Sequence, residues 1–240
     1  MRLEQIEKKI IEFIKTEAKT ASGIVVGLSG GIDSSLVASL CSKALGNKRV
    51  TGLIMPEHEV TKLRDVHDAK QLASELNIRC YISPIDGILS SIIKSQPLLK
   101  DDKKAMGNIK ARVRMILLYA YANMHNYIVA GTGNRSELTT GYFTKYGDGG
   151  VDFMPIADVY KTEVIKLAKY LNIPKSIIDK APSAGLWRGQ TDEEELGMSY
   201  EELDGILKCE IKSPAKVKRV KELMEKSNHK RLLPKMCKIH

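Results

Sequence analysis

A short run rich in glycine and serine follows the first β-branched segment of the chain. Residues 24–28 read Ile-Val-Val-Gly-Leu, and residues 29–35 read Ser-Gly-Gly-Ile-Asp-Ser-Ser. Glycines let consecutive backbone N–H groups approach an anion closely, and the start of a helix adds a favourable partial positive charge. The run therefore predicts a phosphate-binding loop. It differs from the lysine-containing nucleotide loop, because no lysine follows its glycines.

Asp33 is the unusual member of this loop. A carboxylate beside phosphates would repel them unless a metal ion stood between the two, and Mg²⁺ is typically held by one or two carboxylates together with substrate phosphates. A plainer alternative is that Asp33 only stabilises the start of the helix. In its residue pattern the loop resembles the pyrophosphate loop of the ATP pyrophosphatases, which cleave ATP to AMP and pyrophosphate while adenylating a substrate.

Three further segments extend the resemblance over nearly the whole chain. Residues 131–161 begin at the end of a predicted strand and are rich in glycine and polar side chains. Residues 182–187 read Pro-Ser-Ala-Gly-Leu-Trp, and residues 228–231 read Asn-His-Lys-Arg. Together with the loop, these segments are similar to the ammonia-dependent NAD synthetases. The resemblance implies ATP-dependent amidation of the nicotinate carboxylate of deamido-NAD through an adenylated intermediate, with release of AMP and pyrophosphate.

The resemblance also implies roles for particular residues. The residues expected to contact ATP are Gly27, Leu28, Ser29, Gly30, Gly31, Ile32, Asp33, Ser34, Thr132, Lys161 and Ser183. Those expected to contact deamido-NAD are Arg112, Lys145, Asp152, His229 and Lys230. Mg²⁺ is expected at Asp33 and Glu137. Lys161 would supply the positive charge that the loop lacks, because adenylation needs charge neutralised on both the incoming acid and the departing pyrophosphate.

Ammonia must react as the free base, although most of it is protonated near neutral pH. A carboxylate could hold ammonium and accept its proton, and the resemblance together with this chemistry indicates Asp148. The predicted catalytic residues are therefore Asp33, Glu137, Asp148 and Lys161. The four cysteines, none of which lies in a glutaminase-like context, are Cys41, Cys80, Cys209 and Cys237. Ammonia is therefore expected to be free or to come from a separate protein.

Several of these residues also have a purely structural explanation. Glu137 could stabilise the first turn of a short helix after Asn134, and Asp152 could stabilise a turn. Arg112 could be a solvated arginine on an amphipathic helix, and His229 could be a surface histidine.

The elements that must position these residues alternate between strand and helix patterns. β-branched runs predict strands at 24–28, 50–55, 79–82 and 127–130, and apolar residues at helical spacing predict helices at 3–20, 36–45, 61–76, 85–95, 105–125 and 158–171. This alternation predicts an α/β fold with a doubly wound, mostly parallel sheet of the Rossmann-like, ATP pyrophosphatase type. Ligands of such sheets bind outside the carboxyl ends of the strands, where both polar segments begin.

The last third of the chain predicts helices. Its start signals are the capping boxes Thr191 with Glu194 and Ser199 with Glu202, and the N-cap Ser213 before Pro214. We therefore predict one domain over residues 1–240, with an α/β core at 20–172 and a mobile loop and C-terminal helices at 173–240.

Residues 183–198 within this part predict a lid over bound ATP. Three glycines and the only tryptophan, Trp187, lie in this segment, and closure would exclude the water that hydrolyses an acyl adenylate. Trp187 could instead be a core anchor.

Composition excludes several classes of protein. The 240 residues are 43% hydrophobic and 28% charged, which indicates a soluble globular protein rather than a disordered or membrane protein. Scattered cysteines and the lack of a secretory signal favour the cytoplasm. Of the net charge of +9, +8 lies in residues 212–240. A nearly neutral body with one basic end favours a small anionic ligand over nucleic acid.

The helix predicted at 105–125 is apolar on several faces, and a single sheet covers only one of them. We therefore predict a homodimer whose deamido-NAD sites lie at the subunit interface, as the resemblance also implies. Burial of the second face under the N-terminal helix is the alternative.

Two other functions fit part of the pattern. One is another adenylating ATP pyrophosphatase, similar to GMP synthetase or to a tRNA-modifying enzyme. The other is a non-catalytic ATP-binding sensor, which would not need two metal-binding carboxylates.

Overall fold

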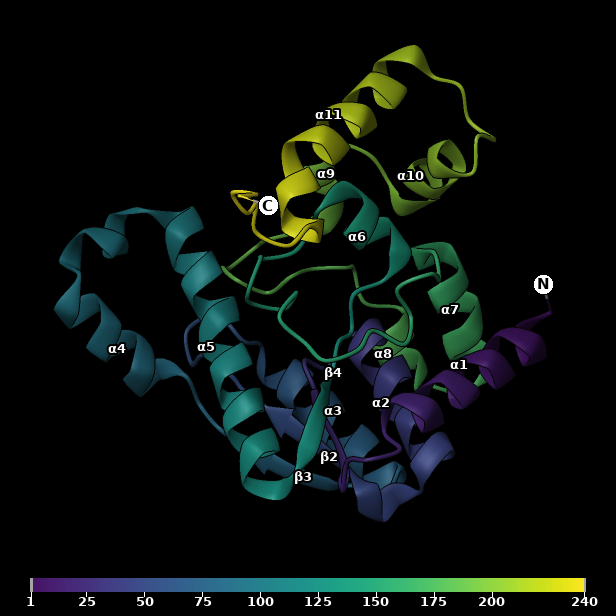
Figure 1. Cartoon of the computed structure of the whole chain (residues 1–240), viewed down its shortest axis with the longest axis vertical. Helices are drawn as coiled ribbons and strands as arrows, with labels where there is room; N and C mark the ends of the chain where they lie inside the picture. Colours follow the sequence, from purple (N-terminus) through teal and green to yellow (C-terminus); the bar gives the residue numbers. More distant parts are fainter. Residues whose placement is uncertain (1, 240) are drawn as a thin grey trace.

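A parallel sheet forms the centre of the computed structural model, which describes residues 2–239 (Figure 1). Its strands are β1 (Gly23–Gly27), β2 (Val50–Ile54), β3 (Arg79–Ile82) and β4 (Tyr127–Ala130), in the order β3-β2-β1-β4. Each neighbouring pair is parallel. The predicted strand positions are confirmed, with end shifts of one residue in β1 and β2. All four carboxyl ends therefore lie at one edge of the sheet.

Two hydrophobic clusters cover the two faces of the sheet. Ile24 and Val26 point into one cluster and Val25 into the other, as alternation along a strand requires. The first cluster contains residues of α1 (Leu3–Glu17), α2 (Ile32–Leu45), α3 (Leu63–Glu75) and α7 (Lys161–Tyr170). The second contains residues of α4 (Asp86–Ser95) and α5 (Lys103–His125). The doubly wound α/β fold is thus confirmed.

Helices dominate the rest of the chain. These are α6 (Arg135–Thr140), α8 (Lys175–Ile178), α9 (Asp192–Leu196), α10 (Tyr200–Leu207) and α11 (Pro214–Arg231), with short 3₁₀ helices at Asn47–Arg49 and Pro97–Asp101. A third hydrophobic cluster, which includes Leu196, Leu203 and Val220, joins α9, α10 and α11. In Figure 1 the helices α9, α10 and α11 lie beyond α6, at the end of the molecule away from the strands. The predicted helical C-terminal portion is confirmed.

The predicted helix starts had mixed outcomes. Ser199 and Glu202 form the expected capping box. The box of Thr191 with Glu194 is wrong, because the Thr191 hydroxyl is buried without a hydrogen-bond partner and Glu194 is exposed. Pro214 begins α11 as expected, but the side chain of Ser213 makes no capping hydrogen bond.

Helix α5 leaves part of its surface uncovered within residues 2–239. Val113 and Leu117 belong to the second cluster, whereas Ile116 is 58% and Met124 77% exposed. The N-terminal helix does not cover this surface, because α1 packs against α2 and α7. That alternative is wrong. No helix within the described residues is both long enough and apolar enough to cross a membrane.

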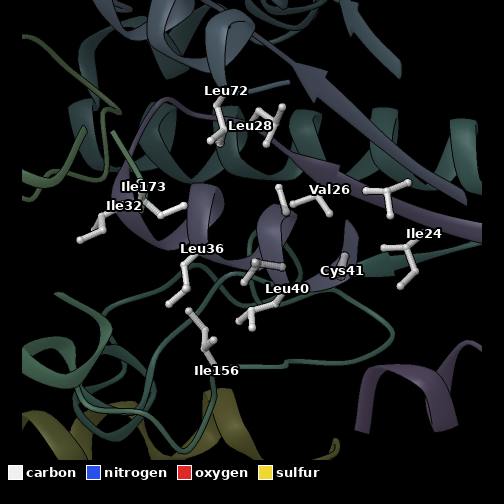
Figure 2. Packing of buried hydrophobic residues seen from close by; sticks show 14 of the residues in the cluster. Ile24, Val26, Leu28, Ile32, Leu36, Leu40, Cys41, Leu72, Ile156 and Ile173 are labelled. Atoms are coloured by element: carbon white, nitrogen blue, oxygen red, sulfur yellow. The ribbon is translucent and has the colours of Figure 1, made fainter. Parts of the chain in front are cut away.

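Helix α2 is the central packing element of the first cluster. Its side chains Leu36 and Leu40 are fully buried and pack in one cluster with Val26 of β1 and Ile156 (Figure 2). A smaller side chain at either position should therefore destabilise the fold.

We expect Leu40→Ala to lower the free energy of unfolding by about 2–5 kcal/mol, because it removes buried methyl groups and leaves a cavity. Leu63→Ala in α3 is the matched control, since Leu63 is 87% exposed, and it should change stability by less than about 0.5 kcal/mol. Urea unfolding of both variants measures the difference. Equal losses would contradict this account of the core.

Candidate functional site

The phosphate loop is held in shape by its own serines. The Ser29 and Ser34 hydroxyls lie 3.0 Å apart, Gly31 N donates to Ser29 Oγ at 3.1 Å, and Ser35 Oγ donates to the Gly31 carbonyl at 2.8 Å. Gly30 has a φ of +77°, and a Cβ there would lie 2.3 Å from the Asp65 carbonyl oxygen. Glycine is required at this position on both counts. These bonds and Gly30 therefore fix the turn of the loop.

Lys161 lies across from this loop and joins it to the segment after β4. The Lys161 ammonium is hydrogen-bonded to Asp33 Oδ2 and lies 3.7 Å from Glu137 Oε1, and the residue is only 2% exposed. Asn134 Nδ2 donates to the other oxygen of Asp33 at 3.0 Å. Residues separated by more than 100 positions thus meet at the carboxyl edge of the sheet. The expected metal ligands and the expected lysine form one cluster, here called the acid–lysine cluster, of Asp33, Glu137 and Lys161.

A capping box orients Glu137 within this cluster. Asn134 Oδ1 accepts from Glu137 N at 3.0 Å, and Glu137 Oε2 accepts from Asn134 N at 3.2 Å. Glu137 therefore does stabilise the start of α6, as the structural alternative proposed. Its other oxygen, Oε1, still faces Lys161, so the local motif also positions a carboxylate in the site.

The acid–lysine cluster holds an excess of buried negative charge. Burial, followed by the charge of Asp33, raises the pKa of Glu137 to about 8, and Lys161 only partly opposes this. Burial disfavours the charge of Lys161, but Asp33 and Glu137 outweigh it and raise the pKa of Lys161. Burial also raises the pKa of Asp192, which accepts a hydrogen bond from the Tyr200 hydroxyl at 3.0 Å. One lysine thus faces three acids, which suits an added cation.

Four of the five residues expected to contact deamido-NAD lie together. Arg112 Nη2 donates to the Lys145 carbonyl at 3.3 Å, and Lys145 Nζ donates to the His229 carbonyl at 2.6 Å. Lys230 Nζ donates to the Gly141 and Phe143 carbonyls at 2.7 and 2.6 Å. The side chain of His229 is exposed on α11. These contacts dock the end of α11 onto the segment that follows α6.

Asp152 has different partners. Its carboxylate accepts from Val129 N at 2.7 Å and from the Tyr119 hydroxyl at 3.0 Å. These bonds attach the segment after β4 to the strand and to α5, so the structure gives Asp152 a structural role. Its contact with deamido-NAD stays a prediction.

Asp148 lies in the turn that follows α6. Asp148 Oδ1 accepts from Thr144 N at 2.9 Å. Neighbouring atoms that displace water from the carboxyl raise its pKa, although the Thr144 N–H and the charge of Lys230 oppose the shift. The residue itself remains exposed to solvent.

The predicted lid is folded against α5 in this structure. Lys110 Nζ donates to the Leu186 carbonyl at 2.9 Å, and Lys103 lies 4.6 Å from the centre of the Trp187 ring. Ser183 Oγ donates to the Gln190 carbonyl at 2.7 Å. Thr132, by contrast, directly follows β4 and is half-buried between two glycines. Trp187 is half-buried, so its burial is intermediate between that of a core anchor and that of an exposed lid residue.

Asp192 and Tyr200 are site residues that sequence reasoning missed. Lys161 Nζ lies 5.2 Å from the centre of the Tyr200 ring, and Tyr200 is 2% exposed. Asp192 lies inside the segment predicted as a lid, which is the only signal that could have indicated it. Tyr200 carries no such signal, because α10 reaches the site only through packing of the C-terminal helices.

Removing the lysine should expose the charge imbalance of the acid–lysine cluster. In the metal-free protein we expect Lys161→Met to lower the free energy of unfolding by about 3–5 kcal/mol at pH 8, because it leaves buried carboxylates unpaired. Lys166→Met, at an exposed position on the same helix, is the matched control. Chemical denaturation in the presence of a chelator measures both.

The loss should be smaller at pH 5. The pKa of Glu137 rises from 4.5 to about 8 on folding, so the folded protein takes up a proton between these values. Lys161 lowers the pKa of Glu137 toward this value of about 8. Its removal therefore adds no cost from Glu137 at pH 5, where this carboxyl is uncharged with or without the lysine, and the added cost grows as the pH rises through about 8. Equal losses at pH 5 and pH 8 would contradict the charge assignment.

Comparisons with known proteins agree with this geometry. A family model described as NAD synthase matches residues 3–234. The chain is similar to an NH(3)-dependent NAD(+) synthetase of Archaeoglobus fulgidus, with 49% identity over 100% of this chain and 98% of the relative.

Two solved structures are similar over almost their whole length. An NMN synthetase of Francisella tularensis has 40% identity and a TM-score of 0.93, and the match covers 99% of each chain. An NH3-dependent NAD synthetase of Campylobacter jejuni has 35% identity and a TM-score of 0.84, over 99% of this chain and 100% of that one. The chain therefore belongs to the NAD synthase family, as its motifs indicated, and is an enzyme of the ligase class.

Proposed function

We propose that this enzyme forms NAD from deamido-NAD, ammonia and ATP through an adenylated nicotinate, with release of AMP and pyrophosphate. The observation that carries the proposal is the acid–lysine cluster facing a preformed phosphate loop. A phosphate loop with carboxylates beside it suits a reaction in which pyrophosphate departs with a metal ion. The similarity to the Archaeoglobus fulgidus enzyme supports ammonia as the nitrogen source.

In the first step the nicotinate carboxylate attacks the α-phosphorus of ATP, and the bond from that phosphorus to the bridging oxygen breaks. The departing pyrophosphate would lie against the backbone N–H groups and hydroxyls of residues 29–35. Lys161 stabilises the anionic groups of this step, because its positive charge sits in a buried site where water cannot screen it. The loop needs no lysine of its own, since Lys161 supplies the cation from α7.

The acid–lysine cluster fits Mg²⁺. Carboxylate oxygens are the ligands that Mg²⁺ prefers, and the raised pKa of Glu137 reports a site with too much negative charge for one lysine. Asp33 and Glu137 would hold the ion, which would neutralise charge on the phosphates of ATP.

In the second step ammonia attacks the acyl carbon, AMP leaves with the electron pair of the bond from its phosphate oxygen to that carbon, and the attacking nitrogen loses one proton to solvent to give the amide. We propose that Asp148 accepts the proton of ammonium, because it is exposed to solvent and has a raised pKa. Free ammonia could reach this residue from solvent, as could ammonia from a separate donor protein.

A second candidate substrate follows from the Francisella tularensis relative. That protein is an NMN synthetase, so the corresponding acid would be nicotinate mononucleotide. Both acids present the same nicotinate carboxylate and differ in the adenylate part. The residues around Arg112, Lys145 and Lys230, rather than the acid–lysine cluster, would therefore decide between them.

We expect the purified protein with ATP, Mg²⁺ and ammonium to convert deamido-NAD to NAD, with one pyrophosphate for each NAD. Chromatography of the nucleotides and a coupled pyrophosphate assay measure both products, and nicotinate mononucleotide is tested in parallel. A higher kcat/KM for the mononucleotide would support the second candidate. Turnover of neither acid would refute both.

Asp33→Asn and Glu137→Gln test the residues of this proposal in the same assay. Each should lower kcat by about 10²–10³, by analogy with the loss of one charge-stabilising group in other active sites. Asp158→Asn is the control, since the Asp158 side chain is 92% exposed and pairs only with Arg135 at the surface. Near-normal turnover by both site variants would contradict the assignment.

We also propose that the enzyme is a homodimer with shared deamido-NAD sites. Helix α5 keeps Ile116 and Met124 exposed, and no other described element covers this face. Arg112 lies on the same helix, in contact with Lys145. A second copy on this face would bury the apolar surface and bring its own groups to the Arg112 region.

Mixing two inactive variants tests the shared site. Arg112→Ala and Asp33→Asn should each be inactive, and mixed dimers should recover about one quarter of the wild-type activity, because half the dimers hold one intact site. Sedimentation velocity checks the mass. Full activity in a monomer would contradict the dimer, and a dimer without recovery would contradict the sharing.

A further inference from the structure

Lys180 lies among three oxygen atoms beside the phosphate loop. Its ammonium donates to the Gly30 carbonyl at 2.9 Å and to Asp65 Oδ1 at 2.6 Å, and it lies 2.6 Å from Asp68 Oδ2. Two of its three N–H groups therefore donate hydrogen bonds, and the third contact is an ion pair with Asp68. Lys180 is therefore held in one place by α3 and, from there, contacts the backbone of the loop.

The cluster of Lys180, Asp65 and Asp68 is well shielded from solvent. The side chains of Lys180 and Asp68 are 17% and 6% exposed. Burial alone would raise the pKa of Asp68, but the hydrogen bond and charge of Lys180 outweigh it and lower the pKa. Ser176 Oγ also donates to Asp68, at 3.3 Å. The cluster is thus a rigid, charged support.

The bond to Gly30 determines how the central peptide of the loop is oriented. A trans peptide is planar, so its carbonyl and its N–H point in opposite directions. With the Gly30 carbonyl turned to Lys180, the Gly31 N–H points to the other side, where it donates to Ser29 Oγ. Glycine at φ +77° has little preference of its own for this orientation. Ser29 thus holds the N–H side of this peptide, and Lys180 holds its carbonyl side.

Lys180 also joins the loop to the lid segment. Asp192 N donates to the Pro182 carbonyl at 3.1 Å, and Ser183 Oγ donates to the Gln190 carbonyl, so residues 190–192 of the segment return to its start just after Lys180. The base of the lid is thereby attached to the phosphate loop through one side chain.

We propose that Lys180 is a positioning residue for ATP, which holds the Gly30–Gly31 peptide in its phosphate-binding orientation from outside the site. The proposal rests on the proposed function in one respect, that ATP is the ligand of this loop. Lys180 contacts the backbone of the loop, whereas Lys161 contacts the carboxylates of the site.

Direct binding of MgATP, without the acid substrate, tests the proposal. Calorimetry should show at least a tenfold higher Kd for Lys180→Met than for the wild type. In steady state the KM for ATP should rise similarly, while the KM for deamido-NAD stays within twofold. Lys175→Met is the control. The Lys175 side chain is exposed, and its one ion pair, with Asp179, is long at 4.0 Å. Unchanged ATP affinity in Lys180→Met would overturn the proposal.

A second variant separates positioning from charge balance. Lys180→Met combined with Asp65→Asn and Asp68→Asn removes the lysine and both its counter-charges, so it should fold even where the single variant does not. If Lys180 positions the loop, this triple variant keeps the weakened ATP binding. If it binds ATP as tightly as the wild type, Lys180 only balances charge and the proposal is wrong.

Failure of the proposed function would look different. A wild-type protein that binds MgATP but forms no NAD would refute the reaction, and the comparison of ATP affinities would still decide the role of Lys180.

Discussion

A single buried lysine holds three elements together at the carboxyl edge of the sheet. Lys161 begins α7, yet its ammonium bonds Asp33 at the start of α2 and faces Glu137 at the start of α6. These three helices follow different strands or loops, and without a shared cation their acidic side chains would repel one another in a site with little water. The rest of the site is arranged around this constraint. Asn134 holds one oxygen of Asp33, and the capping box of α6 leaves one oxygen of Glu137 free to face the lysine.

The same constraint explains why the site suits a reaction that creates and releases anions. The carboxylates outnumber the lysine, so the cluster can accept a further cation, and the phosphate loop opposite supplies backbone donors for an anion. A substrate that brings phosphates and a metal ion together would complete the balance of charge. In the proposed reaction, the charge balance of this cluster would couple binding to chemistry.

Two elements outside the α/β core complete the site. Helix α10 brings Tyr200 against Lys161, and α11 is docked by Lys230 onto the segment between α6 and Asp148. Their hydrophobic cluster is separate from the two that cover the sheet. The C-terminal helices therefore form the side of the site around Tyr200 and Lys230, while the sheet with α2 and α7 carries the glycine–serine loop and Lys161.

The sequence by itself determined the strands, the phosphate loop and the family, because these depend on local patterns. The β-branched runs at 79–82 and 127–130 became strands with those same ends, and the glycine pair at 30 and 31 predicted a turn in which position 30 requires glycine. Only the tertiary structure decided the partners. Tyr200 and Lys180 reach the site from helices and loops more than 100 residues beyond the phosphate loop, and no local pattern encodes such contacts. The failed Thr191 cap has the same cause, since packing buried its hydroxyl away from the helix.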